Sequence, residues 1–224
     1  MNPSTRPRLH AMILSVSCLF VAVTAAMAAE KAGVVTTLEG RVSVTHGTTG
    51  ADAALNFKDD VFLQDRIATA EQALARMLLG GKAVVTVRER SVLTITEVPG
   101  RSTIALESGK FGLAVARERM GPGEVIEIRT ANAVAGVRGT VVITEVTGSG
   151  ASNARSSSPL QTTFYVFKGS IEATALDPVT GAPTGPPRPV NVMEHFSVAG
   201  TAAPRVAPIL PEHTARITTG LHPK

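Results

Sequence analysis

The chain has 224 residues, a formal net charge of +4, no Trp, one Tyr and a single Cys. This length suits one domain with a hydrophobic core better than two domains. Because aromatic residues are scarce, the core must be built from Val, Ile, Leu, Ala and some of the 7 Phe. No run of Lys and Arg is present, so the composition does not indicate nucleic-acid binding.

Residues 1–28 have the form of a secretory signal peptide. Arg6 and Arg8 precede an almost wholly apolar segment from 11 to 26, and Ala26-Met27-Ala28 has the small-x-small form of a cleavage site. The apolar segment is shorter than the roughly 20 residues of a bilayer-spanning helix. We therefore predict cleavage after Ala28 in preference to an uncleaved membrane anchor.

Cleavage there changes what the composition implies about the mature chain. It removes two Arg and no acidic residue, which leaves 20 basic and 18 acidic residues and a net charge of +2. It also removes Cys18, whose position in the middle of the apolar segment does not favour lipid attachment. The mature chain is expected to be periplasmic or secreted, without a stable membrane span and without disulfides.

Beyond the signal peptide, apolar and polar residues alternate in short runs, which is the pattern of half-buried strands. The expected strands are 34–38, 41–46, 83–87, 92–96, 103–106, 111–115, 125–129, 141–146, 162–167, 170–176, 190–193 and 196–198. Turn sequences such as Pro99-Gly100, Ser108-Gly109 and Gly121-Pro122-Gly123 separate them. Many short strands at roughly 8–12-residue spacing indicate a sandwich, a barrel or a short β-solenoid.

We predict an all-β fold, a single compact domain over residues 29–200 that forms a double-layered or solenoid-like wrap. Residues 70–79 contain good helix formers, but Ala73, Ala75, Met77 and Leu79 also alternate. We assign this segment to a strand. The segments 47–57, 148–159 and 177–189 are expected to be loops, and the Pro-containing tail, residues 201–224, receives no assigned structure.

The segment 130–144 organises the chain, because the polar step Arg138-Gly139-Thr140 interrupts apolar residues that favour strands. A Gly in such a run marks a bulge or a close approach of other atoms. A buried Arg needs a carboxylate partner. We expect Arg138 to be a structural anchor paired with Asp65 or Glu172, and a direct role in binding is the alternative.

No catalytic constellation is recognisable in the sequence. The His residues of the mature chain, His46, His195, His213 and His222, have no metal-ligand spacing, and no nucleophile elbow, P-loop or dinucleotide fingerprint occurs. We expect no catalytic residue, no metal and no cofactor. A hydrolase would need His46 or His195 beside a carboxylate.

Five ordered segments resemble the FecR-domain family, which is named after iron-dicitrate signal transducers. They are the hairpin 35–44, the step 64–69, the pair of segments 78–85 and 91–95, the segment 130–140 ending in Val-Arg-Gly-Thr, and the hairpin 165–172. Two departures are Gln64 where the family usually has Gly, and Gly80 where it usually has Asp. The family-motif residues, in a structural or an interaction role, are Asp65, Thr69, Val137, Arg138, Gly139, Thr140 and Gly169.

The resemblance implies an all-β envelope domain that binds other proteins. In the founding members, a cytoplasmic segment controls a sigma factor and a transmembrane helix crosses the inner membrane. The present chain resembles a stand-alone periplasmic FecR-like domain without the cytoplasmic anti-sigma segment. Its expected partner is an envelope protein, bound by strand addition at a sheet edge. A cell-wall or glycan-associated binding protein is the alternative.

Overall fold

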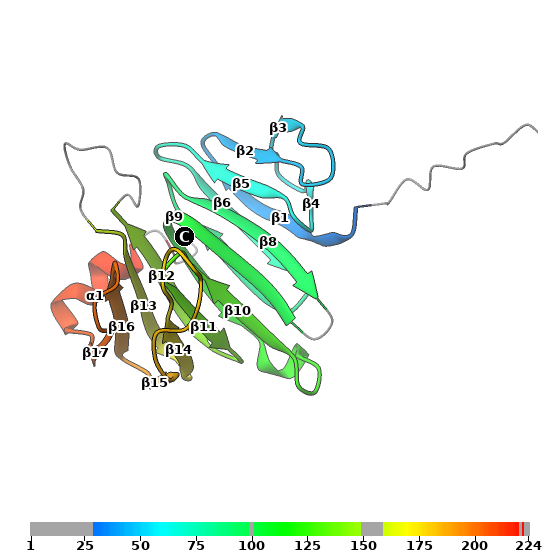
Figure 1. Ribbon diagram of the computed structural model, residues 1–224. Helices are drawn as coiled ribbons and strands as arrows, with labels where there is room; N and C mark the ends of the chain where they lie inside the picture. The colour runs from blue at the N-terminus through cyan, green and yellow to red at the C-terminus, as the bar shows by residue number, and fades with distance from the viewer. Residues whose placement is uncertain (1–28, 99–100, 149–158, 220, 222–224) are drawn as a thin grey trace, which may run out of the picture.

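The computed structural model describes residues 29–98, 101–148, 159–219 and 221, and within them the protein is all-β, as the sequence predicted (Figure 1). Seventeen strands form two layers that share one long strand, β9 (Arg101–Val115). The described residues also contain a 3₁₀ turn, Arg117–Arg119, and one α-helix, α1 (Pro211–Thr218). The predicted signal peptide lies outside the described residues.

The first layer, sheet A, follows a spatial order that starts and ends on short strands. From edge to edge it contains β4 (Asp60–Phe62), β1 (Lys31–Glu39), β6 (Leu74–Leu79), β7 (Ala83–Val87), the second half of β9, β12 (Val141–Thr147), β13 (Gln161–Lys168), β16 (Glu194–Ala199) and β17 (Arg205–Pro208). All neighbouring pairs in this sheet are antiparallel.

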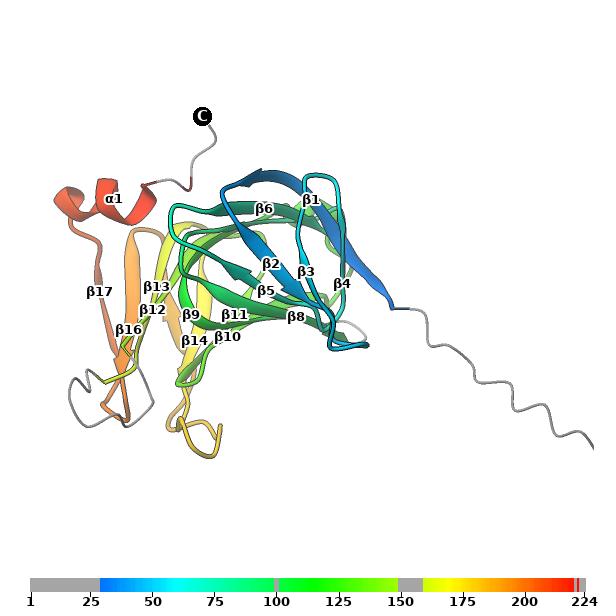
Figure 2. The same cartoon turned by 90° about the horizontal axis from the view of Figure 1, so that it is seen from above.

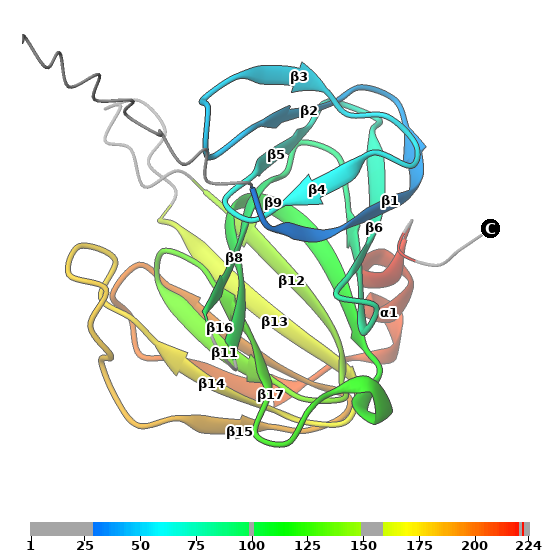
Figure 3. The same ribbon diagram turned by 90° about the vertical axis from the view of Figure 1, so that its right-hand side faces the viewer.

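The second layer, sheet B, faces sheet A. From edge to edge it contains β3 (Asp52–Ala54), β2 (Val42–Thr45), β5 (Arg66–Thr69), β8 (Val92–Val98), the first half of β9, β10 (Val125–Arg129), β11 (Ala133–Val137), β14 (Ile171–Ala175) and β15 (Arg188–Val190). Its one parallel pair is β9 with β10. The two layers and the curvature of the sheets are apparent in Figures 2 and 3.

Strand β9 corrects the sequence prediction of two strands separated by a turn at Ser108-Gly109. The chain does not reverse there but bends, and passes from sheet B into sheet A. Gly109 has φ +90°, a conformation that other residues adopt at a cost, and it allows the bend without ending the strand. The buried side chain of Ser91 fixes the bend, because its Oγ accepts from the N–H of Lys110 at 2.9 Å and donates to the Lys110 carbonyl at 3.1 Å.

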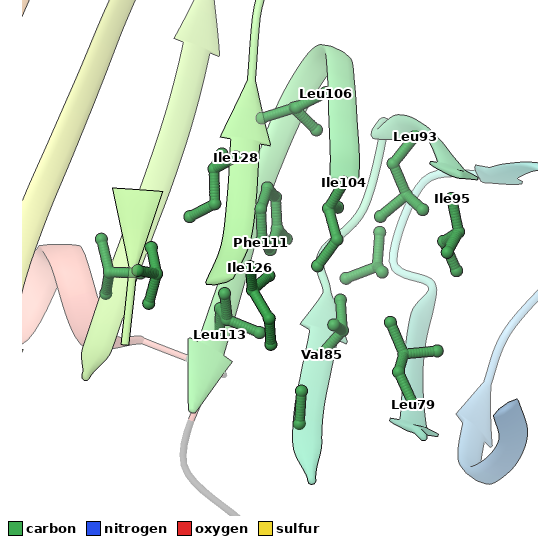
Figure 4. Close-up of a cluster of buried hydrophobic side chains, with 14 of the residues drawn as sticks. Leu79, Val85, Leu93, Ile95, Ile104, Leu106, Phe111, Leu113, Ile126 and Ile128 are labelled. Carbon is green, nitrogen blue, oxygen red and sulfur yellow. The ribbon is translucent and has the colours of Figure 1, made fainter. Parts of the chain in front are cut away.

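The core lies between the two layers and is built from alternate residues of the strands. On β9, Ile104 and Leu106 come from the part in sheet B, while Phe111 and Leu113 come from the part in sheet A (Figure 4). All four are essentially inaccessible to solvent. Burial of each such side chain favours folding by roughly 1.5–3 kcal/mol, so the period-2 pattern decides which face of every strand points inward.

Strand β6 confirms the strand assignment for residues 74–79 of the segment 70–79, while residues 70–73 lie in a turn before it. Ala75, Met77 and Leu79 point into the core, while Arg76 and Leu78 between them are half-buried on the outer face. Alternation therefore predicted the structure where local helix propensity did not. A strand must match its neighbours in a sheet, and this tertiary requirement exceeds a propensity difference of less than about 1 kcal/mol per residue.

Two segments without an assigned strand or helix are ordered by the rest of the fold. The expected loop 47–57 contains β3, which is fully exposed and pairs with β2 through its backbone. The tail contains β17, which pairs with β16, and helix α1. Ile209 and Ile217 of this tail pack on Ile143 outside sheet A, together with Tyr165, Phe167 and Leu221.

All four edge strands of the two sheets are short, with three or four residues each. Pro189 lies in β15 and Pro208 lies in β17. Proline cannot donate a backbone hydrogen bond, so short proline-containing edges discourage pairing with another chain. In the described part of the chain, no helix has the length and apolar character needed to span a bilayer.

Candidate functional site

The family-motif residues from Val137 to Thr140 form a corner where the chain crosses from β11 in sheet B to β12 in sheet A. Gly139 has φ +69°, and an added Cβ would lie 2.5 Å from the Cβ of Arg117. The expectation of a close approach at this Gly is confirmed. Because both the conformation and the space are restricted, Gly139 is required by the fold at this corner.

Gly169 joins the same corner from the opposite crossing. It turns the chain from β13 in sheet A to β14 in sheet B with φ +75°. A Cβ on Gly169 would lie 3.2 Å from the carbonyl oxygen of Gly139. Thr140 is fully buried between them, and its hydroxyl donates to the carbonyl of Ser170 at 3.3 Å. Val137, Gly139, Thr140 and Gly169 therefore hold the two crossings together.

Arg138 is different, because its side chain is exposed. The expected carboxylate partner is absent: among the described residues neither Asp65 nor Glu172 forms an ion pair with it. The prediction of a buried structural anchor is therefore wrong. Arg138 lies on the exposed side of the corner, so no buried charge has to be compensated there.

The Arg138 hollow is a depression of about 290 Å³ beside this residue on the outer side of sheet B. It is lined by Arg117, Val125, Gly136, Val137, Arg138, Ser170, Ile171 and Glu172. Gly136 keeps it open, because an added Cβ would extend toward Val125 Cγ1, at an ordinary 3.7 Å. The guanidinium groups of Arg117 and Arg138 and the carboxylate of Glu172 surround a small apolar surface in this hollow.

Exposure of Arg138 predicts that its replacement will hardly affect stability. Arg138→Ala should change the free energy of unfolding by less than about 0.5 kcal/mol, because no side-chain contact of the fold is lost. Urea unfolding of the variant, with Arg41→Ala as the control, measures this; Arg41 is also exposed. A loss of several kcal/mol would instead show that Arg138 anchors the corner.

Asp65 and Thr69 do not join this corner but stabilise the strands around β5. Asp65 is buried, accepts a hydrogen bond from the N–H of Phe62 at 2.9 Å, and contacts His46 Nδ1 at 3.0 Å. Thr69 is buried at the other end of β5, and its hydroxyl accepts from the N–H of Ser91 at 3.0 Å. Both side chains satisfy backbone groups that would otherwise be buried without partners.

The pair of His46 and Asp65 meets the first requirement for a hydrolase, a His beside a carboxylate. It does not extend to a triad, because no Ser, Thr or Cys is hydrogen-bonded to His46 in the described segments. His195 lies beside Tyr165, with ring centroids 5.7 Å apart, and not beside a carboxylate. Among the described residues, no group of three or more His, Cys, Asp or Glu could hold a metal ion.

A buried polar network that sequence reasoning missed lies at the start of the motif segment. Asn132 is fully buried and donates from Nδ2 to the carbonyls of Leu160 at 3.1 Å and Val198 at 3.3 Å. Its Oδ1 accepts from the hydroxyl of Thr162 at 2.5 Å, and that hydroxyl also contacts Thr130 Oγ1 at 2.8 Å. The network ties the turn between β10 and β11 to β13 and β16. In the sequence, the one signal of this network is that Thr130 and Asn132 are polar residues of types common in turns.

The segment that carries Arg117 is held against sheet A by Glu124, which contacts the ammonium group of Lys82. This hydrogen bond, and a second from the N–H of Gly121 at 2.8 Å, lower the pKa of the Glu124 carboxyl. A lowered pKa in the folded state means that ionised Glu124 favours folding. The contribution is present above the ordinary value of 4.5 and is lost as the pH falls through the folded value.

Glu124→Gln should therefore lower stability at pH 7 by about 1.5–3 kcal/mol, the usual contribution of hydrogen bonds to a charged group. As the pH falls through the lowered pKa of Glu124, the variant and the parent should converge, because protonation removes the same interaction from the parent. Urea unfolding at pH 7 and pH 3 measures the difference, and Glu118→Gln, at an exposed position, is the control. An equal loss at both pH values would show that ionisation of Glu124 is unimportant.

Comparison with known proteins agrees with this arrangement. Residues 65–172 match the family model described as FecR protein. Two crystal structures of a candidate anti-sigma factor from Parabacteroides distasonis ATCC 8503 have a similar fold, each with a TM-score of 0.51 and 16% sequence identity over 69% of this chain. The chain spans 65% and 64% of those two proteins, and at this identity the likeness shows the fold alone.

A comparison with curated proteins finds no match. The matched segment runs from Asp65 to Glu172, so it contains the corner, Arg138 and all the other family-motif residues. The family match and the order of the motifs agree with each other. Residues 65–172 therefore form a FecR domain.

Proposed function

We propose that the protein is a non-enzymatic, protein-binding signalling module of the bacterial envelope, with Arg138 at the centre of its binding surface. FecR proteins are regulatory and envelope-associated, and the structural neighbours are candidate anti-sigma factors. This family evidence supports the class of function. The exposure of Arg138 at the corner supports the proposed location of the surface.

The proposed location of the binding surface is supported by the difference in exposure between Arg138 and the residues around it. The fold requires Gly139, Thr140 and Gly169, because the two Gly have a restricted conformation and Thr140 is fully buried. Arg138 lies in the same motif, yet its side chain is exposed and forms no ion pair among the described residues. Arg is enriched at the centres of protein interfaces because its planar guanidinium binds carboxylates with two hydrogen bonds.

The shape of the surface favours recognition by side chains over the expected strand addition. Arg117 and Arg138 flank the Arg138 hollow, and Glu172 is the one acidic group in its lining. A partner that places an acidic side chain there, with an apolar neighbour on Gly136, would be complementary. The short edge strands and the two prolines give strand addition little backbone to pair with.

The proposed compartment is the periplasm. It is supported by the charge pattern, the apolar segment and the small-x-small site of residues 1–28, together with the envelope association of the family. We propose that the FecR domain supplies the protein-binding part of a signalling circuit. The sigma-factor control that the name of the Parabacteroides protein suggests is a further property of that protein.

Site-specific cross-linking in the producing bacterium tests the proposal. A photoreactive amino acid replaces Arg138 in one strain and Arg41 in another, and the cross-linked products are recovered and analysed by mass spectrometry. An envelope protein captured from position 138 and not from position 41 is the expected result. Capture of cell-wall fragments from position 138 would instead favour the glycan-associated alternative, and equal capture from both positions would contradict a surface centred on Arg138.

Substitutions in the purified protein then measure the contribution of the hollow to binding of the captured partner. Arg138→Ala should weaken binding by at least tenfold, in line with the loss of more than about 1 kcal/mol at an interface anchor. Gly136→Val should also weaken it, because the added side chain fills the hollow at an outward strand position where the fold tolerates one. Unchanged affinity in both variants would locate the partner elsewhere.

A further inference from the structure

A second hollow, of about 620 Å³, lies on the outer face of sheet A beside helix α1, away from the motif corner. This volume is within the roughly 300–1,000 Å³ range of small-molecule pockets. Its lining is mostly apolar and includes Val84, Ala114, Val141, Ile143, Phe167 and Leu221. The polar residues Arg76, Thr86, Thr214 and Thr218 complete it.

The lining follows from the register of the central strands. Val84 of β7 is paired with Ala114 of β9, and Ala114 is paired with Val141 of β12, so their side chains form an apolar row on one face. Gly112 lies next along β9, and Leu221 approaches to 3.2 Å of where its Cβ would be. Helix α1 forms one wall through Thr214 and Thr218. The hollow is thus framed by α1 and the segment that follows it.

Arg76 is the one charged group of this lining. It is half-buried, and its Nε donates to the hydroxyl of Thr86 at 3.1 Å. None of the ion pairs among the described residues includes Arg76. A guanidinium partly removed from water without an anion is unfavourable, and a carboxylate within the hollow would supply the missing bidentate partner.

Positive charge also gathers at the adjoining end of the same face. Arg88 lies two residues after Thr86, and Lys110 lies two residues before Gly112. Both line a depression of about 430 Å³ together with Arg216 of α1, Arg90, Glu89 and Glu145. Burial lowers the pKa of Lys110, Glu145 opposes this, and the charges of Arg88 and Arg216 add to it. The basic side chains that line this depression outnumber the acidic ones, which favours an anionic ligand.

We propose that the hollow beside α1 binds a fatty acid, with its hydrocarbon chain on Val84, Ala114 and Val141 and its carboxylate on Arg76. An apolar trough with one unpaired guanidinium is complementary to a ligand that is hydrocarbon along its length and anionic at one end. This site is separate from the Arg138 hollow and does not depend on the protein-binding function.

A fluorescent fatty acid, cis-parinaric acid, serves as the probe, with its uncharged methyl ester as the matched ligand. It is titrated into the protein in the form recovered from cells, with competition by palmitate. Arg76→Met should weaken binding of the acid at least tenfold and leave binding of the ester within twofold, because only the charge pairing is lost. Ala114→Trp should abolish binding of both ligands, because the indole fills the trough from an exposed position.

Arg41→Met is the control for removal of an exposed charge and should bind like the parent. Circular dichroism confirms that each variant is folded; if Ala114→Trp is not, Arg76→Met alone decides. No binding of cis-parinaric acid by the parent, or binding that survives both Arg76→Met and Ala114→Trp, would overturn the proposal. A dimer of the parent that Ala114→Trp dissociates, without fatty-acid binding, would show that a second copy covers this face.

Discussion

Gly109→Ala should destabilise the protein by about 3–5 kcal/mol, the combined cost of a left-handed backbone conformation and of overpacking. Gly109 has φ +90°, and its added Cβ would lie 2.5 Å from Ser91 Cα and 2.7 Å from the carbonyl oxygen of Arg90. Both of these are backbone atoms, so neither can move aside as a flexible side chain could. Any shift would also disturb the hydrogen bonds of Ser91 to Lys110 that fix the bend of β9.

Gly123→Ala is the matched control for this substitution. Gly123 has φ +75°, and nothing lies within 4 Å of its added Cβ, so only the conformational cost of about 1–2 kcal/mol remains. Urea unfolding, followed by circular dichroism, gives both free energies. Equal effects at the two positions would mean that the close approach to Ser91 is relieved without cost, and that the bend of β9 is less restricted than the distances indicate.

Asn132→Ala should have the second-largest effect, a loss of about 3 kcal/mol, because each buried polar group left without a partner costs about 1–3 kcal/mol. The substitution would leave the carbonyls of Leu160 and Val198 and the hydroxyl of Thr162 without the amide that now bonds to them. Three separate segments would lose their common contact at once. The same unfolding experiment measures the change in free energy.

The exposed Asn191 provides the control, since Asn191→Ala should cost less than about 0.5 kcal/mol. Thr162→Val tests whether the groups act as a network. In a double-mutant cycle with Asn132→Ala, the second substitution should cost less than it does alone, by about 0.5–3 kcal/mol. Additive effects would show that Asn132 and Thr162 contribute independently and that the network is not a unit.

In the functional site, the sequence did not predict the environment of Arg138. The motif correctly identified a restricted Gly, because a Gly within a run of strand-forming residues indicates a bulge or a close approach. It did not indicate that the approaching residue is Arg117, which is distant in sequence. It did not determine whether Arg138 faces the core or the solvent. That depends on the direction of the crossing between β11 and β12, which the packing of the two sheets sets.

The hollow beside α1 lies still further from what the sequence could indicate. Its lining comes from segments as distant as Arg76 and Leu221, and it forms because the tail returns across sheet A. The tail has little strand or helix pattern of its own, and an isolated helix of 8 residues is only marginally stable. Packing of Ile209 and Ile217 on Ile143 orders it.

The sequence by itself determined the all-β class, the bounds of strands such as β7 and β10, the strand character of residues 74–79, and the presence of a FecR domain. These properties follow from side-chain alternation, turn residues and motif order, which are local along the chain. Only the tertiary structure decided that β9 continues through Gly109, that Asn132 is a buried connector and that Arg138 is exposed. Each of these depends on contacts between segments far apart in sequence, where pairing and burial, not local preference, set the free energy.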